Sequence, residues 1–124
     1  MGLFNTRMQT TQKLLTKRNL RKLYNCFIKL PPFSEYSMPV AHRVRFEVIN
    51  DNEVFGWFEP APPVIKIDEV MNKTSHEIFQ TLLHEMIHLY LWYNNHKDYD
   101  KHDKKFNLIA KKVCKIYNYS LKEF

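Results

Sequence analysis

The chain has 124 residues, of which 44% are hydrophobic and 15% aromatic, and its formal net charge at pH 7 is +6. This length supports a single domain, and the hydrophobic content excludes a disordered chain. No apolar run is long enough to span a membrane, and the basic N-terminal stretch lacks the apolar segment of a secretory signal. We therefore expect one domain over residues 1–124 that is cytoplasmic, monomeric and without a membrane partner.

The first predicted element is a helix over residues 11–30, in which apolar residues recur at helical spacing until Pro31 and Pro32 end the pattern. The other face of this helix is basic. Its basic residues are Lys13, Lys17, Arg18, Arg21 and Lys22. A proline-punctuated connection over residues 31–41 separates the helix from the elements that follow.

A small three-stranded sheet is predicted over residues 42–67. In residues 42–49, apolar and charged residues alternate with a period of two, which is typical of a half-buried strand. Two shorter strands are predicted at residues 54–58 and 64–67, on either side of a proline-rich break. Gly56 in the second strand indicates either a bulge or a close approach of the backbone to another element.

Two helices are predicted over residues 75–117. The first begins after Thr74, which forms a capping box with Glu77, and its broad apolar face continues to about Tyr93. The second begins near His102 and carries an apolar stripe. Its remaining surface is basic, with Lys104, Lys105, Lys111 and Lys112. The order of one helix, three strands and two helices predicts an α+β fold.

The strongest chemical signal is the pattern H-E-x-x-H in the first of these two helices, formed by His84, Glu85 and His88. Residues four apart lie on one face of a helix, so both imidazoles can bind one Zn²⁺. Glu85 then lies beside the metal, where a carboxylate can hold a zinc-bound water and take its proton. The pattern predicts one catalytic zinc ion. A surface histidine pair on an amphipathic helix is the alternative interpretation.

A catalytic zinc normally takes three protein ligands. Leu91 and Asn94 occupy the positions where the spacing H-E-x-x-H-x-x-G-x-x-H requires glycine and histidine, which excludes that class. No glutamate occurs between Glu85 and Glu123, which excludes a glutamate ligand from the following helix. The remaining candidates are His96, His102, Asp98, Asp100 and Asp103. We favour His102 over His96, because a helix start packed against the first helix can bring an imidazole to the metal.

Taken together, these features resemble the SprT-like family of zinc metalloproteases. The resemblance rests on TLLHEMIHLYLW at residues 81–92, on HDKKF at residues 102–106, and on the strands at residues 56–58 and 64–67. It extends over roughly residues 42–117, and the combined spacing is more specific than H-E-x-x-H alone.

The resemblance implies a zincin-like fold in which His84, His88 and His102 bind zinc and Glu85 is the catalytic base. It also implies cleavage of proteins that are bound or crosslinked to DNA. Two features depart from the family pattern. Asp103 stands where a glycine usually follows the third histidine, and the two cysteines lie too far apart in the sequence to form the family's C-terminal zinc ribbon. We expect both cysteines to be free thiols.

The leading functional hypothesis is therefore a zinc endopeptidase with protein substrates, whose two basic helix faces bind DNA. The alternative is a non-proteolytic, zinc-containing module that binds nucleic acid or a protein partner. A peptidase of this kind commonly holds its substrate along an exposed strand edge near the metal. Residues 56–58 and residues 64–67 are both candidates for that edge.

Overall fold

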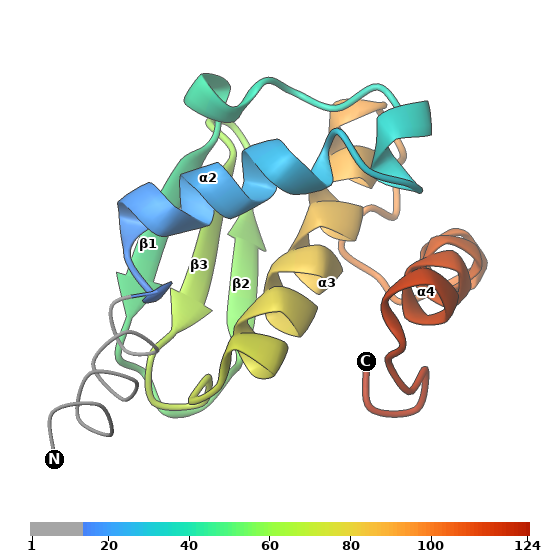
Figure 1. Cartoon of the computed structure of the whole chain (residues 1–124). Coiled ribbons are helices and arrows are strands. Elements are labelled where there is room, and N and C mark those ends of the chain that lie inside the picture. Colours follow the sequence, from blue (N-terminus) through green and yellow to red (C-terminus); the bar gives the residue numbers. More distant parts are fainter. Residues whose placement is uncertain (1–13) are drawn as a thin grey trace, which may run out of the picture.

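The computed structural model describes residues 14–124, which form a three-stranded sheet with helices packed against it (Figure 1). In chain order the elements are α2 (Lys17–Phe27), β1 (Arg45–Ile49), β2 (Gly56–Glu59), β3 (Val64–Asp68), α3 (Ser75–Tyr93) and α4 (Lys104–Tyr117), with 3₁₀ turns at Phe33–Glu35 and Ala41–Arg43. This order confirms the predicted α+β fold class. Within the described part of the chain, no helix is both long and apolar enough to cross a bilayer.

The first helix is shorter than predicted. Helix α2 starts at Lys17 because the side chain of Thr16 caps it, accepting a hydrogen bond from the backbone N–H of Asn19 at 3.1 Å. It ends at Phe27, where the chain turns away four residues before the first proline. The predicted helix was therefore too long at both ends, because residues 15–16 and 28–30 are not helical. Residues 11–13, including Lys13, lie outside the described part of the chain.

The sheet has the order β1-β3-β2, with β1 parallel and β2 antiparallel to the central strand β3. This order decides which candidate strand has a free edge, because β3 is paired on both sides and β2 on one. The first strand begins at Arg45 rather than at residue 42, since residues 41–43 form a 3₁₀ turn. The second begins at Gly56 rather than at residue 54.

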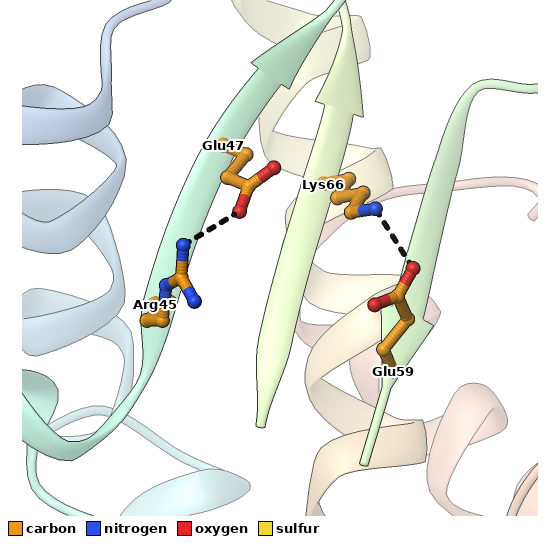
Figure 2. Close-up of polar contacts among 4 residues, drawn as sticks. All are labelled: Arg45, Glu47, Glu59 and Lys66. Carbon is orange, nitrogen blue, oxygen red and sulfur yellow. Dashed lines mark hydrogen bonds and ion pairs between the residues drawn. The ribbon is translucent and has the colours of Figure 1, made fainter. Parts of the chain in front are cut away.

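One face of the sheet is buried against the helices and the other carries charges. Phe46 of β1 and Ile65 and Ile67 of β3 are at most 2% exposed. Figure 2 shows the opposite face, where Arg45 pairs with Glu47 at 3.3 Å and Lys66 pairs with Glu59 at 2.7 Å. Exposed ion pairs of this kind contribute at most about 1 kcal/mol each, so the apolar face holds the sheet to the helices.

The two C-terminal helices begin at side-chain caps. Thr74 and Glu77 form the predicted capping box, with Thr74 Oγ1 accepting from Glu77 N and Glu77 Oε1 accepting from Thr74 N. Helix α4 begins at Lys104, because Asp103 accepts hydrogen bonds from the first turn. The predicted start at His102 was two residues early, and His102 instead lies immediately before the cap.

Asp68, at the end of β3, joins two loops to the sheet. Its buried carboxylate accepts hydrogen bonds from the backbone N–H groups of Asp51, Asn52, Val70 and Met71. Burial alone would raise the pKa of Asp68, but these four donors more than offset it, and the pKa lies below its ordinary value of 3.8. The ionised form of Asp68 therefore stabilises the fold.

A group with a lowered folded-state pKa adds stability above its unfolded pKa and loses it as the pH falls through the folded value. We therefore expect Asp68→Asn to lower the free energy of unfolding by roughly 2–4 kcal/mol at pH 7, since the amide accepts fewer and weaker hydrogen bonds. The difference from the wild type should shrink below about pH 4. Urea unfolding at pH 7 and pH 3 measures the difference in the free energy of unfolding between the variant and the wild type. Asp51→Asn is the control, because Asp51 is exposed. If this difference is the same at both pH values, the ionised form of Asp68 does not stabilise the fold.

Candidate metal centre

The first two histidines of the centre lie one turn apart on α3. Their ring centroids are 5.2 Å apart, and His88 is 6% exposed while His84 is half-buried. Helix α3 is enclosed by the sheet and by α4, which explains why its apolar residues surround the helix rather than form one stripe. The histidine face is the part of the helix that opens toward the loop before α4.

His102 reaches the same place from that loop, which runs from Asn94 to Asp103. Its Nε2 lies 3.2 Å from Nε2 of His84 and 3.2 Å from Nε2 of His88. The His102 ring also contacts the ring of Phe106, one turn into α4, with centroids 4.5 Å apart. Because Asp103 fixes the start of α4, the packing of Phe106 against the core also fixes the position of His102.

The spacing of these nitrogens fits a tetrahedral zinc ion. Two nitrogens bound at 2.0–2.1 Å in a tetrahedral arrangement lie about 3.3–3.4 Å apart, close to the observed 3.2 Å. In residues 14–124, the histidines 84, 88 and 102 are the one group whose ligand atoms gather in this way. Three of the other candidates have different contacts: His96 Nδ1 lies 2.9 Å from Lys105 Nζ, Asp98 pairs with Lys101, and Asp103 caps α4. The fourth, Asp100, lines the same cavity as the three histidines but is not in the group whose ligand atoms converge.

The surroundings keep the two imidazole rings on α3 in the neutral form that binds metal. Burial, together with the neighbouring rings of His88 and His102, lowers the pKa of His84 to about 3. Burial also lowers the pKa of His88, against the opposing effect of the Tyr99 carbonyl. His88 Nδ1 lies 2.7 Å from this carbonyl oxygen and donates to it, so its Nε2 carries the free lone pair.

Glu85 lies beside the histidines and is 6% exposed. Burial raises the pKa of its carboxyl to about 8. It lines two adjoining cavities, one of about 370 Å³ and one of about 230 Å³, and His84 lines both as well. The smaller cavity also contains His88 and His102. A cation held there would favour the ionised carboxylate, so Glu85 is placed to exchange a proton next to a bound metal.

At Gly56 the edge strand β2 comes very close to this helix. A Cβ atom on Gly56 would lie 2.6 Å from Thr81 Cγ2 and 3.1 Å from Glu85 Oε2. The pairing of β2 with β3 continues through Gly56 without an extra residue. Of the two explanations offered for this glycine, the close approach is therefore correct and the bulge is wrong.

We expect Gly56→Ala to lower the free energy of unfolding by about 1–3 kcal/mol, because the added methyl group overlaps Thr81 and displaces Glu85. Thr81→Ser supplies the matched partner, since it removes the Cγ2 methyl and keeps the hydroxyl. The double variant Gly56→Ala/Thr81→Ser should recover part of the loss in urea unfolding experiments. If the effects of the two substitutions on the free energy of unfolding simply add, the contact with Thr81 is not the cause of the lost stability.

Asn72 holds β2 at this short distance, and nothing in the sequence pattern pointed to it. Its Nδ2 donates to the carbonyl of Phe55 at 2.9 Å and to that of Asp68 at 2.7 Å. Its Oδ1 accepts from Thr81 Oγ1 at 2.7 Å. A single buried amide therefore connects the start of β2, the end of β3 and the helix that carries the site.

The residues predicted to bind nucleic acid lie on two helices. All of those in the described residues are exposed, namely Lys17, Arg18, Arg21 and Lys22 on α2 and Lys104, Lys105, Lys111 and Lys112 on α4. Of these, Lys112 lies over the ring of Tyr36, 5.9 Å from its centroid. The two helices meet where Phe27 contacts Tyr117, with ring centroids 5.6 Å apart.

An α+β fold with three histidines around one point and a buried glutamate beside them is compatible with the zincin class of metal-dependent hydrolases. The model of the SprT-like family matches residues 36–123, most of the chain, so the protein belongs to the SprT-like family. This family is associated with metallopeptidase-like function. A search of curated proteins gave no match. Cys26 and Cys114 are both free, as expected.

Proposed function

We propose that this SprT-like protein is a zinc-dependent endopeptidase that cleaves proteins bound or crosslinked to DNA. The observation that carries the zinc assignment is the convergence of three imidazole Nε2 atoms, with two separations of 3.2 Å. Zn²⁺ at this position would lower the pKa of a bound water to about 7 and polarise a peptide carbonyl. A structural zinc would need no buried carboxylate beside it, so Glu85 favours catalysis over the alternative of a binding module.

In this proposal Glu85 takes a proton from the attacking water and passes it to the leaving amine. His88 stays oriented through its hydrogen bond to the Tyr99 carbonyl. The substrate binds as an extended peptide along the free edge of β2, which lies directly against the catalytic helix at Gly56. The cavity of about 370 Å³ next to His84 and Glu85 then receives a substrate side chain.

The DNA part of the proposal is supported by charge. The chain has 19 Lys and Arg against 13 Asp and Glu, and the basic residues on α2 and α4 are exposed. No ion pair within residues 14–124 uses them. Lysine and arginine contacts to phosphate release counterions, so binding through these faces should weaken steeply with added salt.

The test is a cleavage assay with the zinc-loaded protein. An unfolded protein and a DNA-bound basic protein are incubated with it, each with and without duplex DNA, and fragments are followed by gel electrophoresis. We expect cleavage that a chelator abolishes and that DNA increases. Absence of cleavage in every arm, with zinc bound, would favour the binding module, and cleavage that DNA leaves unchanged would remove the DNA part alone.

A further inference from the structure

The two histidines of α3 differ in what their second ring nitrogen contacts. His88 Nδ1 donates to the Tyr99 carbonyl, whereas His84 Nδ1 is the one buried side-chain nitrogen or oxygen in residues 14–124 without a hydrogen-bond partner. Histidines that bind metal almost always donate this second N–H to a carbonyl, carboxylate or water, which orients the ring. His84 therefore needs an acceptor, and the neighbouring backbone shows where one is available.

The group that faces His84 is Phe124. Its ring lies 5.3 Å from the His84 ring, and both residues line the cavity of about 370 Å³. The backbone of Phe124 also lies near His84, although no hydrogen bond of normal geometry forms between them. The segment Asn118–Phe124, called here the C-terminal segment, thus places backbone acceptor groups beside His84.

The C-terminal segment is held along the same side of α3 that carries His84. Asn118 has a left-handed conformation, with φ of 61°, which turns the chain back at the end of α4. The hydroxyl of Tyr119 donates to the His76 carbonyl at 3.2 Å, and Gln80 Nε2 donates to the Glu123 carbonyl at 3.2 Å.

Residues 76, 80 and 84 are spaced by four, so they form one row along the helix. The first two members of this row bind the C-terminal segment, and the third is the histidine that lacks an acceptor. The segment therefore follows the row toward the metal centre and ends beside His84.

We propose that the C-terminal segment is an outer part of the metal centre, in which the Phe124 backbone carbonyl accepts the Nδ1 proton of His84 and orients the ring for zinc. Its role for His84 corresponds to that of the Tyr99 carbonyl for His88. Tyr119 and Gln80 are positioning residues that act by holding the segment in place. This inference rests on the proposed zinc site but does not depend on peptidase activity.

The test measures zinc affinity by competition with a chelator in the full chain. The double variant Gln80→Met/Tyr119→Phe keeps side-chain size but removes both hydrogen bonds to the segment, and a second variant lacks residues 119–124. Loss of an outer partner typically costs 10–100-fold in metal affinity. We expect about a 10-fold loss in the double variant and a larger loss in the shortened one. The visible spectrum of the Co²⁺-loaded protein should change as well, because the ligand geometry is altered.

Lys122→Ala is the matched control, because this exposed residue lies in the same segment and its side chain faces solvent. It should bind zinc within twofold of the wild type. Circular dichroism of the metal-free proteins shows whether each variant folds. If the shortened chain does not fold, the zinc affinity of the double variant alone tests the proposal. Wild-type zinc affinity and an unchanged Co²⁺ spectrum in the folded variants would overturn the proposal. A wild-type protein that binds zinc but cleaves nothing would refute the peptidase proposal and leave this one standing.

Discussion

Replacing Glu85 with glutamine is expected to lower the rate of peptide hydrolysis by about 10²–10⁴-fold while zinc remains bound. Glutamine has nearly the same shape as glutamate and fits the space beside Gly56, but it cannot take a proton from water. The three histidines are untouched, so zinc affinity should stay within a few-fold of the wild type. Initial cleavage rates and chelator competition, measured on the same preparation, separate these two effects.

The same substitution has a second expected result in the metal-free protein. Burial raises the folded-state pKa of Glu85 to about 8, from an ordinary value of 4.5. A raised carboxyl pKa means that stability is highest below the unfolded value and falls as the pH rises from about 4.5 to about 8. Glutamine does not ionise, so metal-free Glu85→Gln should be more stable than the wild type by roughly 1–3 kcal/mol at pH 7.

Glu47→Gln is the control for both measurements, because Glu47 lies on the charged face of the sheet (Figure 2), where it pairs with Arg45. It should change neither the cleavage rate nor the stability by more than a small amount. Full activity in Glu85→Gln with zinc bound would show that another group acts as the base. Lost activity together with lost zinc would show instead that Glu85 supports the metal.

Local sequence signals were sufficient where neighbouring residues determine the structure. Thr74 and Glu77 predicted the start of α3, because a capping box is formed by groups three residues apart. The position of His84 and His88 on one face followed from helix geometry alone. These features depend on contacts within one turn of helix, so the sequence contains all the information they need.

Features that depend on the arrangement of elements could not be predicted in the same way. Residues 56–58 and 64–67 are both short apolar strands, and only the order β1-β3-β2 shows that β2 has the free edge. Asn72 has no special sequence context, and its three side-chain hydrogen bonds join parts of the chain that meet only in the fold. The C-terminal segment was missed because backbone groups make many of its contacts, and side-chain patterns do not record them.

His102 lies between these two cases, because its role was predicted from the sequence but its position depends on how α4 packs. Its replacement by alanine is expected to lower zinc affinity by more than about 100-fold. The reason is that loss of an outer partner already costs 10–100-fold, and His102 contributes a nitrogen to the centre itself. The side chain is exposed and precedes the cap of α4, so the fold should remain intact. Chelator competition gives the affinity, and thermal unfolding of the metal-free protein checks the fold.

The matched control for this prediction is His96→Ala, because His96 lies in the same loop but contacts Lys105 instead of the other histidines. It should retain zinc affinity and activity, which separates loss of a ligand from a general disturbance of the loop. The reverse result, with zinc lost in His96→Ala and kept in His102→Ala, would show that the loop supplies a different histidine when metal is bound. If neither variant loses zinc, one of the loop aspartates must complete the site, and Asp100, which lines the cavity with His102, would be the first to test.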